Sequence, residues 1–510
     1  MRGPTWWTRK FLDISGSGMF TQVLTIEGFC LVALGTLLGI TVGAVPGLTG
    51  AMLISLSLPL TFSMEGTSAM LLLVSMYVGA VSGGLISATL LRMPGTPASV
   101  MTTLDGYPMA RQGRARRALV LGAGASLFGG LVSWGFLVLL AKPVSEWSTR
   151  FGPFEFFSLV LMALSIIAGM GGRGAVLRGL FAGSLGILFA MPGLSPATGE
   201  PRWIFGFPAM SDGFKLLPVL IGLFAMNQVL REVLGLAGKP EVLGGQSRGM
   251  LPSFREWRDQ LVNLIRSSVI GTWVGILPGA GANVGSVMAY SASKGLSSEP
   301  EKFGTGCDEG VVASESANNA TVGGALIPLV AMGIPGSLID AILLGAFVLH
   351  GLQPGPLLFA NHPEVVDAIL GAALVANLVM FAVMFWMARW IAKLAFAPRA
   401  ILLPMVVVCS VIGSFALSNR MFDVWVMLAF GIVGFVMERL RIPLAPFVIG
   451  FVLAPIAEEN LAAGLMASGG SLLPMFTRPI SLVFVLIAIG LLVGPVLLNL
   501  KKTIPKDNQP

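Results

Sequence analysis

Charged residues are scarce in this chain of 510 residues, in which Asp, Glu, Lys and Arg make up 11% and hydrophobic residues 55%. Cysteine and histidine are nearly absent. Cys30, Cys307 and Cys409 have neither metal-site spacing nor a disulfide pattern, and His350 and His362 lie near one loop. The sequence also lacks a phosphate-binding Gly-rich motif with its Lys and a nucleophile–base pair. We therefore expect no ATP hydrolysis, no other enzymatic activity and no cofactor.

What the chain has in abundance is apolar sequence, with a mean hydropathy of +0.85. Stretches long enough to cross a hydrocarbon core of about 30 Å recur from residue 22 to residue 499. These features predict an all-α polytopic membrane protein. The net charge of +7 comes from Lys and Arg in the connecting loops, which indicates a topology signal and no nucleic-acid partner.

Two segments of the chain resemble each other. The sequence VGAVPGLTG at 42–50 matches VGILPGAGA at 274–282, and about forty residues later each copy has a Gly-Gly and a second Pro-Gly. Four breaks in matched order predict two internal repeats. The expected divisions are an N-terminal tail at 1–21, a first transmembrane repeat at 22–235, a polar linker at 236–260, a second transmembrane repeat at 261–499 and a polar C-terminal tail at 500–510.

The charges bear on the orientation of the repeats. RQGRARR at 111–117 follows the first pair of breaks and marks the cytoplasmic side, whereas 350–366, which follows the second pair, has no Lys or Arg. This contrast favours inverted repeats. The basic N-terminal tail and the basic linker 231–266 each precede their copy, which is the pattern of a parallel repeat. We give the dense 111–117 cluster more weight.

The second copy also predicts a re-entrant hairpin. Its arms, 267–277 and 282–292, are each too short to span a membrane, and Pro278 and Gly279 lie at the tip. Pro278 removes a backbone donor, and the glycines permit conformations closed to other residues. In the first copy the leading segment, 22–45, is long enough to span.

Such tips are suited to binding ions. Free carbonyls suit Na⁺ and free N–H groups suit a carboxylate. A lone Pro-Gly in a membrane helix is more often a kink, but four copies in repeated context favour a binding role. The candidate substrate- and ion-binding residues at the breaks are Pro46, Gly47, Thr49, Gly50, Pro94, Gly95, Thr96, Pro278, Gly279, Gly281, Asn283, Pro335, Gly336 and Ser337. We expect no metal site apart from Na⁺ at these positions.

A second candidate group follows the hairpin. On a helix, Glu315, Asn318 and Asn319 form one polar face, and an intramembrane carboxylate usually faces a cavity or a coupling ion. The alternative is that Asp308, Glu309 and Glu315 all belong to a wet helix entrance. Two adjacent amides in lipid would each need partners, which favours the functional interpretation.

Four further charged residues attract less interest. Arg92 precedes a break, where it either attracts an anionic substrate or extends to the interface. Asp105, Asp340 and Asp423 lie near the ends of predicted spans, and we expect them to be solvated.

Taken together, VGAVPGLTG, MPGTPASVMTTLDGYPMARQG, GILPGAGA and SESANNATVGGALIPLVAMGIPGS resemble the large membrane subunit of bacterial tripartite tricarboxylate transporters. The resemblance covers about residues 24–499. It implies about 12 transmembrane helices in the bacterial inner membrane. It also implies two partners, a small membrane subunit and a periplasmic solute-binding protein that captures a carboxylate such as citrate. A gradient of Na⁺ or H⁺ would drive uptake.

Paired breaks around a midplane site suit alternating access, with Glu315, Asn318 and Asn319 contributing to coupling. The alternative is an ion or solute channel lined by the same helix breaks.

Overall fold

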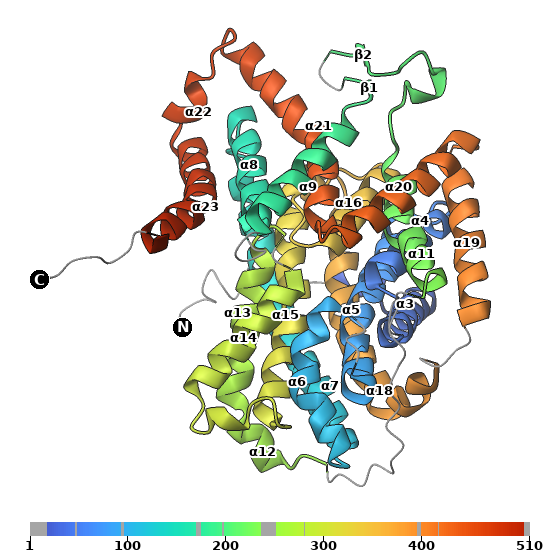
Figure 1. Cartoon of the computed structure of the whole chain (residues 1–510), viewed down its shortest axis with the longest axis vertical. Helices are drawn as coiled ribbons and strands as arrows, with labels where there is room; N and C mark the ends of the chain where they lie inside the picture. The colour runs from blue at the N-terminus through green and yellow to red at the C-terminus, as the bar shows by residue number, and fades with distance from the viewer. Residues whose placement is uncertain are drawn as a thin grey trace, which may run out of the picture.

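The computed structural model describes residues 18–45, 48–92, 96–169, 175–195, 198–235, 251–279, 281–394, 399–416 and 418–503. Within them the regular structure is almost entirely helical (Figure 1), as the sequence predicts. The exception is a short hairpin in which β1 (Gly193–Leu194) pairs antiparallel with β2 (Pro201–Arg202).

The first half of the chain is a series of helices interrupted at the predicted breaks. Its helices are α2 (Gly18–Thr21), α3 (Ile26–Ala44), α4 (Gly50–Thr61), α5 (Gly66–Leu91), η1 (Pro97–Ser99), α6 (Val100–Arg111), α7 (Ala115–Ser148), α8 (Pro153–Gly169), α9 (Ala175–Ala190), η2 (Pro208–Met210), α10 (Leu216–Ile221), η3 (Gly222–Met226) and α11 (Asn227–Val233). The last three run on without interruption.

The second half begins within the predicted polar linker. Its helices are α12 (Phe254–Asp259), α13 (Leu261–Ile276), α14 (Gly281–Leu296), η4 (Pro300–Lys302), α15 (Asp308–Met332), α16 (Leu338–Leu349), α17 (Pro356–Asn361), α18 (Pro363–Leu394), α19 (Arg399–Ala416), α20 (Met421–Arg439), α21 (Leu444–Ala467), α22 (Leu473–Thr477) and α23 (Pro479–Thr503). In both halves a long helix, α5 or α15, leads into a break and then a 12-residue helix, α6 or α16.

The two halves pack on each other reciprocally. Helix α7 packs on α13 and α15 of the second half, and α18 packs on α3 and α5 of the first. The outer helices also pack across the two halves: α9 of the first half packs on α21, and α20 of the second half packs on α10, η3 and α11. This exchange is what two structurally related halves would produce; the orientation of the repeats stays a prediction.

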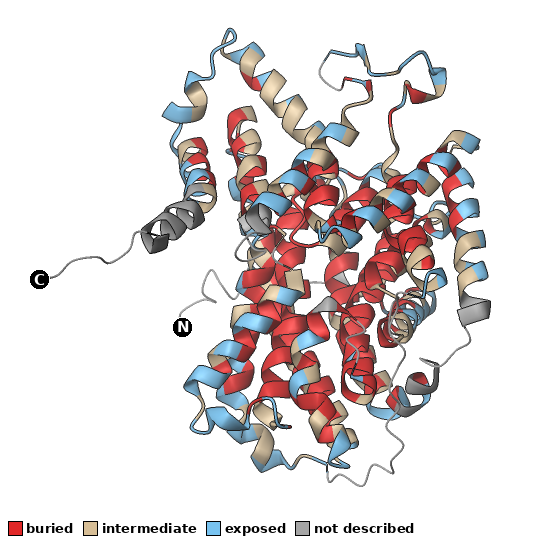
Figure 2. Cartoon of the chain, in the orientation of Figure 1, coloured by how far each residue is buried: buried red, intermediate tan, exposed pale blue. Residues whose placement is uncertain are grey.

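Helices α5 and α15 form the centre of the molecule, and Figure 2 shows buried residues concentrated there. Glycines let these helices approach their neighbours closely. A Cβ added to Gly79 of α5 would lie 2.3 Å from the carbonyl oxygen of Thr36 in α3, and one on Gly324 of α15 would lie 2.3 Å from that of Thr272 in α13.

Two packed helices lie where the sequence predicts a hairpin; its re-entry into the membrane stays a prediction. Helices α13 and α14 lie side by side, and the Ser293 hydroxyl in α14 donates to the Asn263 side chain in α13 at 3.0 Å. Each arm has 16 residues, about five more than we expected. At the tip Gly279 and Gly281 both have positive φ, 76° and 60°, as the sequence predicts.

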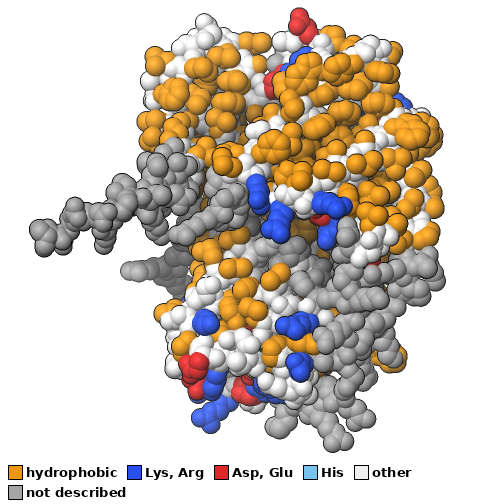
Figure 3. Space-filling model, in the orientation of Figure 1, with side chains coloured by type: hydrophobic (Ala, Val, Ile, Leu, Met, Phe, Trp, Pro, Cys, Tyr) orange, Lys and Arg blue, Asp and Glu red, His pale blue; other side chains and the backbone are white. Residues whose placement is uncertain are grey.

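Seven helices in the described residues are long and apolar enough to cross a membrane, and seven shorter helices are apolar. The space-filling view shows hydrophobic side chains over much of one face, with Lys and Arg gathered below them (Figure 3). These features establish a multi-pass membrane protein; the total of about 12 spans stays a prediction.

Candidate functional site

Residues at or next to the predicted breaks line one cavity of about 840 Å³, which we call the central cavity. Its walls come from both halves of the chain. The lining residues are Thr49, Gly50, Ala51, Tyr77, Ala80, Val81, Thr96, Ala98, Phe224, Arg231, Gly279, Gly281, Ala282, Asn283, Ser337, Leu338, Ile339, Phe435, Glu438, Arg439, Arg441, Ile442, Pro443, Leu444 and Ala445.

One wall of the central cavity is made of helix beginnings. Helices α4, α14 and α16 begin at Gly50, Gly281 and Leu338, all of which line it. Thr49 and Ser337 cap α4 and α16, where their hydroxyls accept from backbone N–H groups at 3.1 and 3.3 Å. The first N–H groups of a helix lack intrahelical partners, and its N-terminus carries a partial positive charge. This wall therefore favours an anion.

The lining also includes four charged residues, which come from the ends of α11 and α20 and the connection after α20. Arg231 pairs with Glu438 at 2.7 Å, while Arg439 and Arg441 form no ion pair within the described part of the chain. The lining thus has a net charge of about +2 from Arg and Glu side chains. The sequence analysis did not single out these arginines. Arg439 and Arg441 lie at a short connection between apolar helices and Arg231 opens the basic linker 231–266, so all three look like an ordinary topology signal.

The structure brings seven of the predicted residues to the cavity wall and leaves others away from it. Those in the lining are Thr49, Gly50, Thr96, Gly279, Gly281, Asn283 and Ser337. Pro278, Pro335 and Gly336 are adjacent in sequence but not in the lining, and a Cβ on Gly336 would lie 2.7 Å from the Gly275 carbonyl oxygen. Pro46, Gly47, Pro94 and Gly95 fall outside the described residues.

Glu315 and its two amides lie behind the cavity wall. Glu315 is fully buried and accepts hydrogen bonds from the hydroxyls of Thr102 in α6 and Ser126 in α7. The wet-entrance alternative is therefore wrong for Glu315. The interpretation as a wet helix entrance fits Asp308 and Glu309 better, because both are half-buried at the start of α15.

Asn318 and Asn319 have partners in α5. The Asn319 Oδ1 accepts from the Ser82 hydroxyl at 2.6 Å, and the Asn318 amide donates to the backbone oxygen of Val81 at 3.3 Å. Val81 itself lines the central cavity. The polar face of α15 thus contacts the cavity through α5, one layer away.

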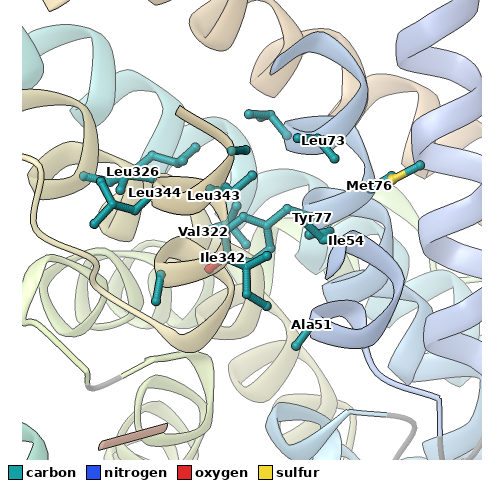
Figure 4. Close-up of a cluster of buried hydrophobic side chains, with 14 of the residues drawn as sticks. Ala51, Ile54, Leu73, Met76, Tyr77, Val322, Leu326, Ile342, Leu343 and Leu344 are labelled. Atoms are coloured by element: carbon teal, nitrogen blue, oxygen red, sulfur yellow. The ribbon is translucent and has the colours of Figure 1, made fainter. Parts of the chain in front are cut away.

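Asp340 departs from the sequence expectation, because it is buried with no exposed surface. It lies in the first turn of α16, three residues after Ser337. The Ser337 hydroxyl is 2.9 Å from the Tyr77 hydroxyl, and both residues line the central cavity. Figure 4 shows Tyr77 among buried hydrophobic side chains that include Ile54, Val322 and Ile342.

Asp105 and Asp423 are buried as well, against expectation, but both have partners. Asp105 accepts hydrogen bonds from the backbone N–H groups of Gly304, Gly306 and Cys307 at 2.8–2.9 Å. It also accepts one from the Tyr290 hydroxyl at 2.7 Å. These contacts hold α6 to the loop before α15. Asp423 accepts from Arg420 at 3.0 Å.

A cluster of charges joins α7, α12 and the start of α15. Arg117 donates to Asp308 at 2.6 Å and pairs with Glu256. Hydrogen bonds from the Ser253 backbone N–H and from Arg117 lower the pKa of Glu256 to about 2. Beside it, Trp257 packs on Gly124 of α7. This cluster holds α12, which lies in the polar linker, against α7 and the start of α15.

Arg92, the remaining charge that the sequence analysis considered, does not line the central cavity. Its guanidinium lies over the Tyr107 ring, 5.5 Å from the centroid. Its backbone is left-handed, with φ of 53°, and ends α5.

Comparison with known proteins matches residues 29–449 to the family described as "Tripartite tricarboxylate transporter TctA family". The chain belongs to this family. An Agrobacterium vitis protein described as "Uncharacterized 52.8 kDa protein in TAR-I ttuC' 3'region" is 33% identical to this TctA-family chain over 472 residues, covering 92% of this chain and 93% of that protein.

A second Agrobacterium vitis protein, described as "Uncharacterized protein in TAR-II ttuC' 3'region", is 35% identical over 211 residues, covering 41% of the TctA-family chain and 87% of that protein. No solved structure matches the chain. The resemblance found in the sequence motifs is thus confirmed, and family membership identifies a transport protein.

Proposed function

We propose that this chain is the large transport subunit of a binding-protein-dependent secondary transporter, and that it imports carboxylates through the central cavity. Tricarboxylates and dicarboxylates are the substrate class. The single observation that carries the proposal is the convergence of helix N-termini from both halves of the chain on one cavity. Family membership supports a role in transport, and the helix N-termini and arginines that line the cavity support an anionic substrate.

The charges of the cavity fit a substrate with several carboxylates. The N-termini of α4, α14 and α16 offer N–H donors, and Arg439 and Arg441 offer cationic groups without an ion-pair partner in the described chain. Arginine binds carboxylates through two parallel hydrogen bonds. A di- or tricarboxylate has enough carboxylates to bind both the helix N-termini and the arginines, whereas a monocarboxylate has one.

The two halves also differ in a way that supports alternating access. Helix α14 packs extensively on α13, whereas the corresponding α4 contacts α3 only slightly and packs on α5, α16 and α19. Conversely α6 folds back on α5, whereas the corresponding α16 packs on α4 and α21. In transporters with inverted repeats, the halves exchange such conformations when the site opens to the other side of the membrane. This gives the asymmetry a function.

Glu315, Asn318 and Asn319 contribute to coupling in this proposal, together with a gradient of Na⁺ or H⁺. The buried carboxylate lies between α6, α7 and α15, so a change in its charge would affect how α6 packs. The expected partners are a small membrane subunit and a periplasmic solute-binding protein, and the expected location is the bacterial inner membrane.

The test is uptake of labelled citrate, and of a panel of labelled dicarboxylates, into vesicles that contain this chain, the small subunit and the binding protein. A Na⁺ or a pH gradient is imposed in separate experiments. Accumulation that requires the binding protein and one gradient is the expected result. Downhill flux that depends on neither the binding protein nor a gradient would instead indicate a channel lined by the same helix breaks.

A further inference from the structure

The carboxylate of Asp340 is the least satisfied polar group beside the central cavity. It has no exposed surface, and within the described part of the chain neither oxygen has a hydrogen-bond partner at normal geometry. The hydroxyls of Tyr77 and Ser337 lie beside it. Glu315 differs in this respect, because two hydroxyls donate to its oxygens.

Few charged or titratable groups face Asp340. The helices packed against α16 are α4, α5, α10, α15 and α21. Helices α4 and α10 carry none, and Tyr77 is the one on α5. On α15, Asp308 and Glu309 lie at the far end of the helix, and Glu315 accepts hydrogen bonds from side chains of α6 and α7. On α21, Glu458 forms an ion pair with Arg202, and Glu459 is the next residue. No Lys, Arg or His of the described residues pairs with Asp340.

These surroundings decide the charge state. An ionised carboxylate in the membrane interior needs a cation or several hydrogen-bond donors, and without them the group takes up a proton instead. Asp340 has no cation beside it in the described structure, and its nearest donors are the hydroxyls of Tyr77 and Ser337, so its surroundings favour the protonated form. Asn would reproduce its shape and its lack of charge.

Asp340 is also within one helical turn of the cavity wall. Ser337 lines the cavity, its hydroxyl accepts from the backbone N–H of Asp340 at 3.3 Å, and it shares a hydrogen bond with Tyr77. A carboxylate substrate bound at this wall would therefore lie close to Asp340. Two like charges so close in a low-dielectric interior repel each other strongly.

We propose that Asp340 is a proton-binding site that must be protonated before a carboxylate substrate occupies the central cavity. The inference rests on the proposed function and adds the coupling ion and its residue. One proton from the side where substrate enters forms an O–H bond on Asp340 and neutralises it. The carboxylate then binds, the cavity opens to the other side, and substrate and proton leave into water there, which regenerates the anionic Asp340 for the next cycle.

The test uses the same vesicles, with a pH-sensitive dye inside and the membrane potential clamped by K⁺ and valinomycin. The variants are Asp340→Asn and, as a matched control, Asp367→Asn in α18, a half-buried Asp outside the cavity lining. Each is assayed for accumulation of a labelled di- or tricarboxylate under an imposed pH gradient, and for exchange of labelled against unlabelled substrate.

In the wild type and in Asp367→Asn, one proton carried per substrate turns a gradient of one pH unit into accumulation of up to about tenfold. Asp340→Asn is expected to show no accumulation and no substrate-dependent dye signal, while exchange continues because it needs no net proton movement. Tyr77→Phe, which removes the adjacent hydroxyl, is expected to slow the dye signal without abolishing it.

Several results would overturn the inference. One is proton-coupled accumulation by Asp340→Asn equal to that of the wild type. Another is wild-type uptake that follows a Na⁺ gradient and ignores pH. A third is failure of Asp340→Asn to fold, because a neutral isostere must fit a site that is neutral. If the wild type transports no carboxylate at all, both the proposed function and the inference fail. If the wild type accumulates carboxylate without a substrate-dependent dye signal, the inference alone fails.

Discussion

Replacing Gly79 by Ala tests whether the close approach of α3 and α5 shapes the central cavity. The new Cβ would lie 2.3 Å from the Thr36 carbonyl oxygen, whereas ordinary contact starts at 3.4 Å, so the helices would have to separate by about 1 Å. The obstructing atom is backbone and cannot rotate away. Tyr77, Ala80 and Val81 on α5 line the cavity and would move with the helix.

The magnitude follows from two opposing effects. Overpacking costs up to about 3 kcal/mol when the neighbours cannot yield. The higher helix propensity of Ala returns about 1 kcal/mol. The net loss of folding free energy for Gly79→Ala is therefore about 2 kcal/mol. The matched control is Gly135→Ala in α7, where an added Cβ meets no atom within 4 Å and only the gain applies.

The assay is the melting temperature in detergent, followed by carboxylate uptake in vesicles. Gly79→Ala is expected to melt at a lower temperature and to transport more slowly, and Gly135→Ala to melt at the same or a higher temperature with wild-type transport. If both variants melt and transport alike, the helix contact does not set the cavity wall and the reasoning is refuted.

Three further changes address charge. Glu315→Gln is expected to fold normally and to lose gradient-driven uptake, because the amide fills the same space but cannot change its charge. Arg439→Gln together with Arg441→Gln is expected to raise the KM for a carboxylate severalfold and leave kcat largely unchanged, because these arginines attract the anion and do not move it. Acid is expected to release α12 from α7, because hydrogen bonds lower the pKa of Glu256 from an ordinary 4.5 to about 2 in the folded protein. The contribution of Glu256 to stability is complete above about pH 4.5 and is lost as the pH falls towards 2. Trp257 fluorescence reports the change.

Each of these has its own contradicting result. Unchanged ion-driven uptake in Glu315→Gln removes Glu315 from the coupling mechanism. An unaltered KM in the double arginine variant would mean that the cationic side of the cavity plays no part in binding. For α12, Glu256→Gln serves as the control, and a fluorescence change that keeps the same acid dependence in this variant would assign the transition to another group.

The helix breaks could be predicted from the sequence because their causes are local. Pro278 and the two glycines at the hairpin tip act through their own backbone conformations, and both glycines have the positive φ that the pattern suggests. The repetition along the chain predicts which breaks belong together, and that pairing stays a prediction. The predicted hairpin, the convergence of the short polar residues and the family all follow from such short-range features.

The other wall of the cavity could not be predicted in the same way. Arg231, Arg439 and Arg441 come from the ends of α11 and α20 and reach the cavity through the packing of helices some 200 positions apart in the chain. Their sequence context is a basic connection between apolar segments, which is also the usual signature of a cytoplasmic loop. A single sequence offers no sign that separates these two roles.

Asp340 shows where a sound rule about charges fails. A charge near the end of a membrane span is normally solvated, because the ends of a spanning helix lie at the membrane surface. Helix α16 has only 12 residues and begins at a break, so its first turn lies inside the protein, beside the central cavity. The predicted break at Pro335 and Gly336 thus lies just before Asp340, and a charge that closely follows such a break in a short helix is buried where a charge at the end of a full span would be solvated.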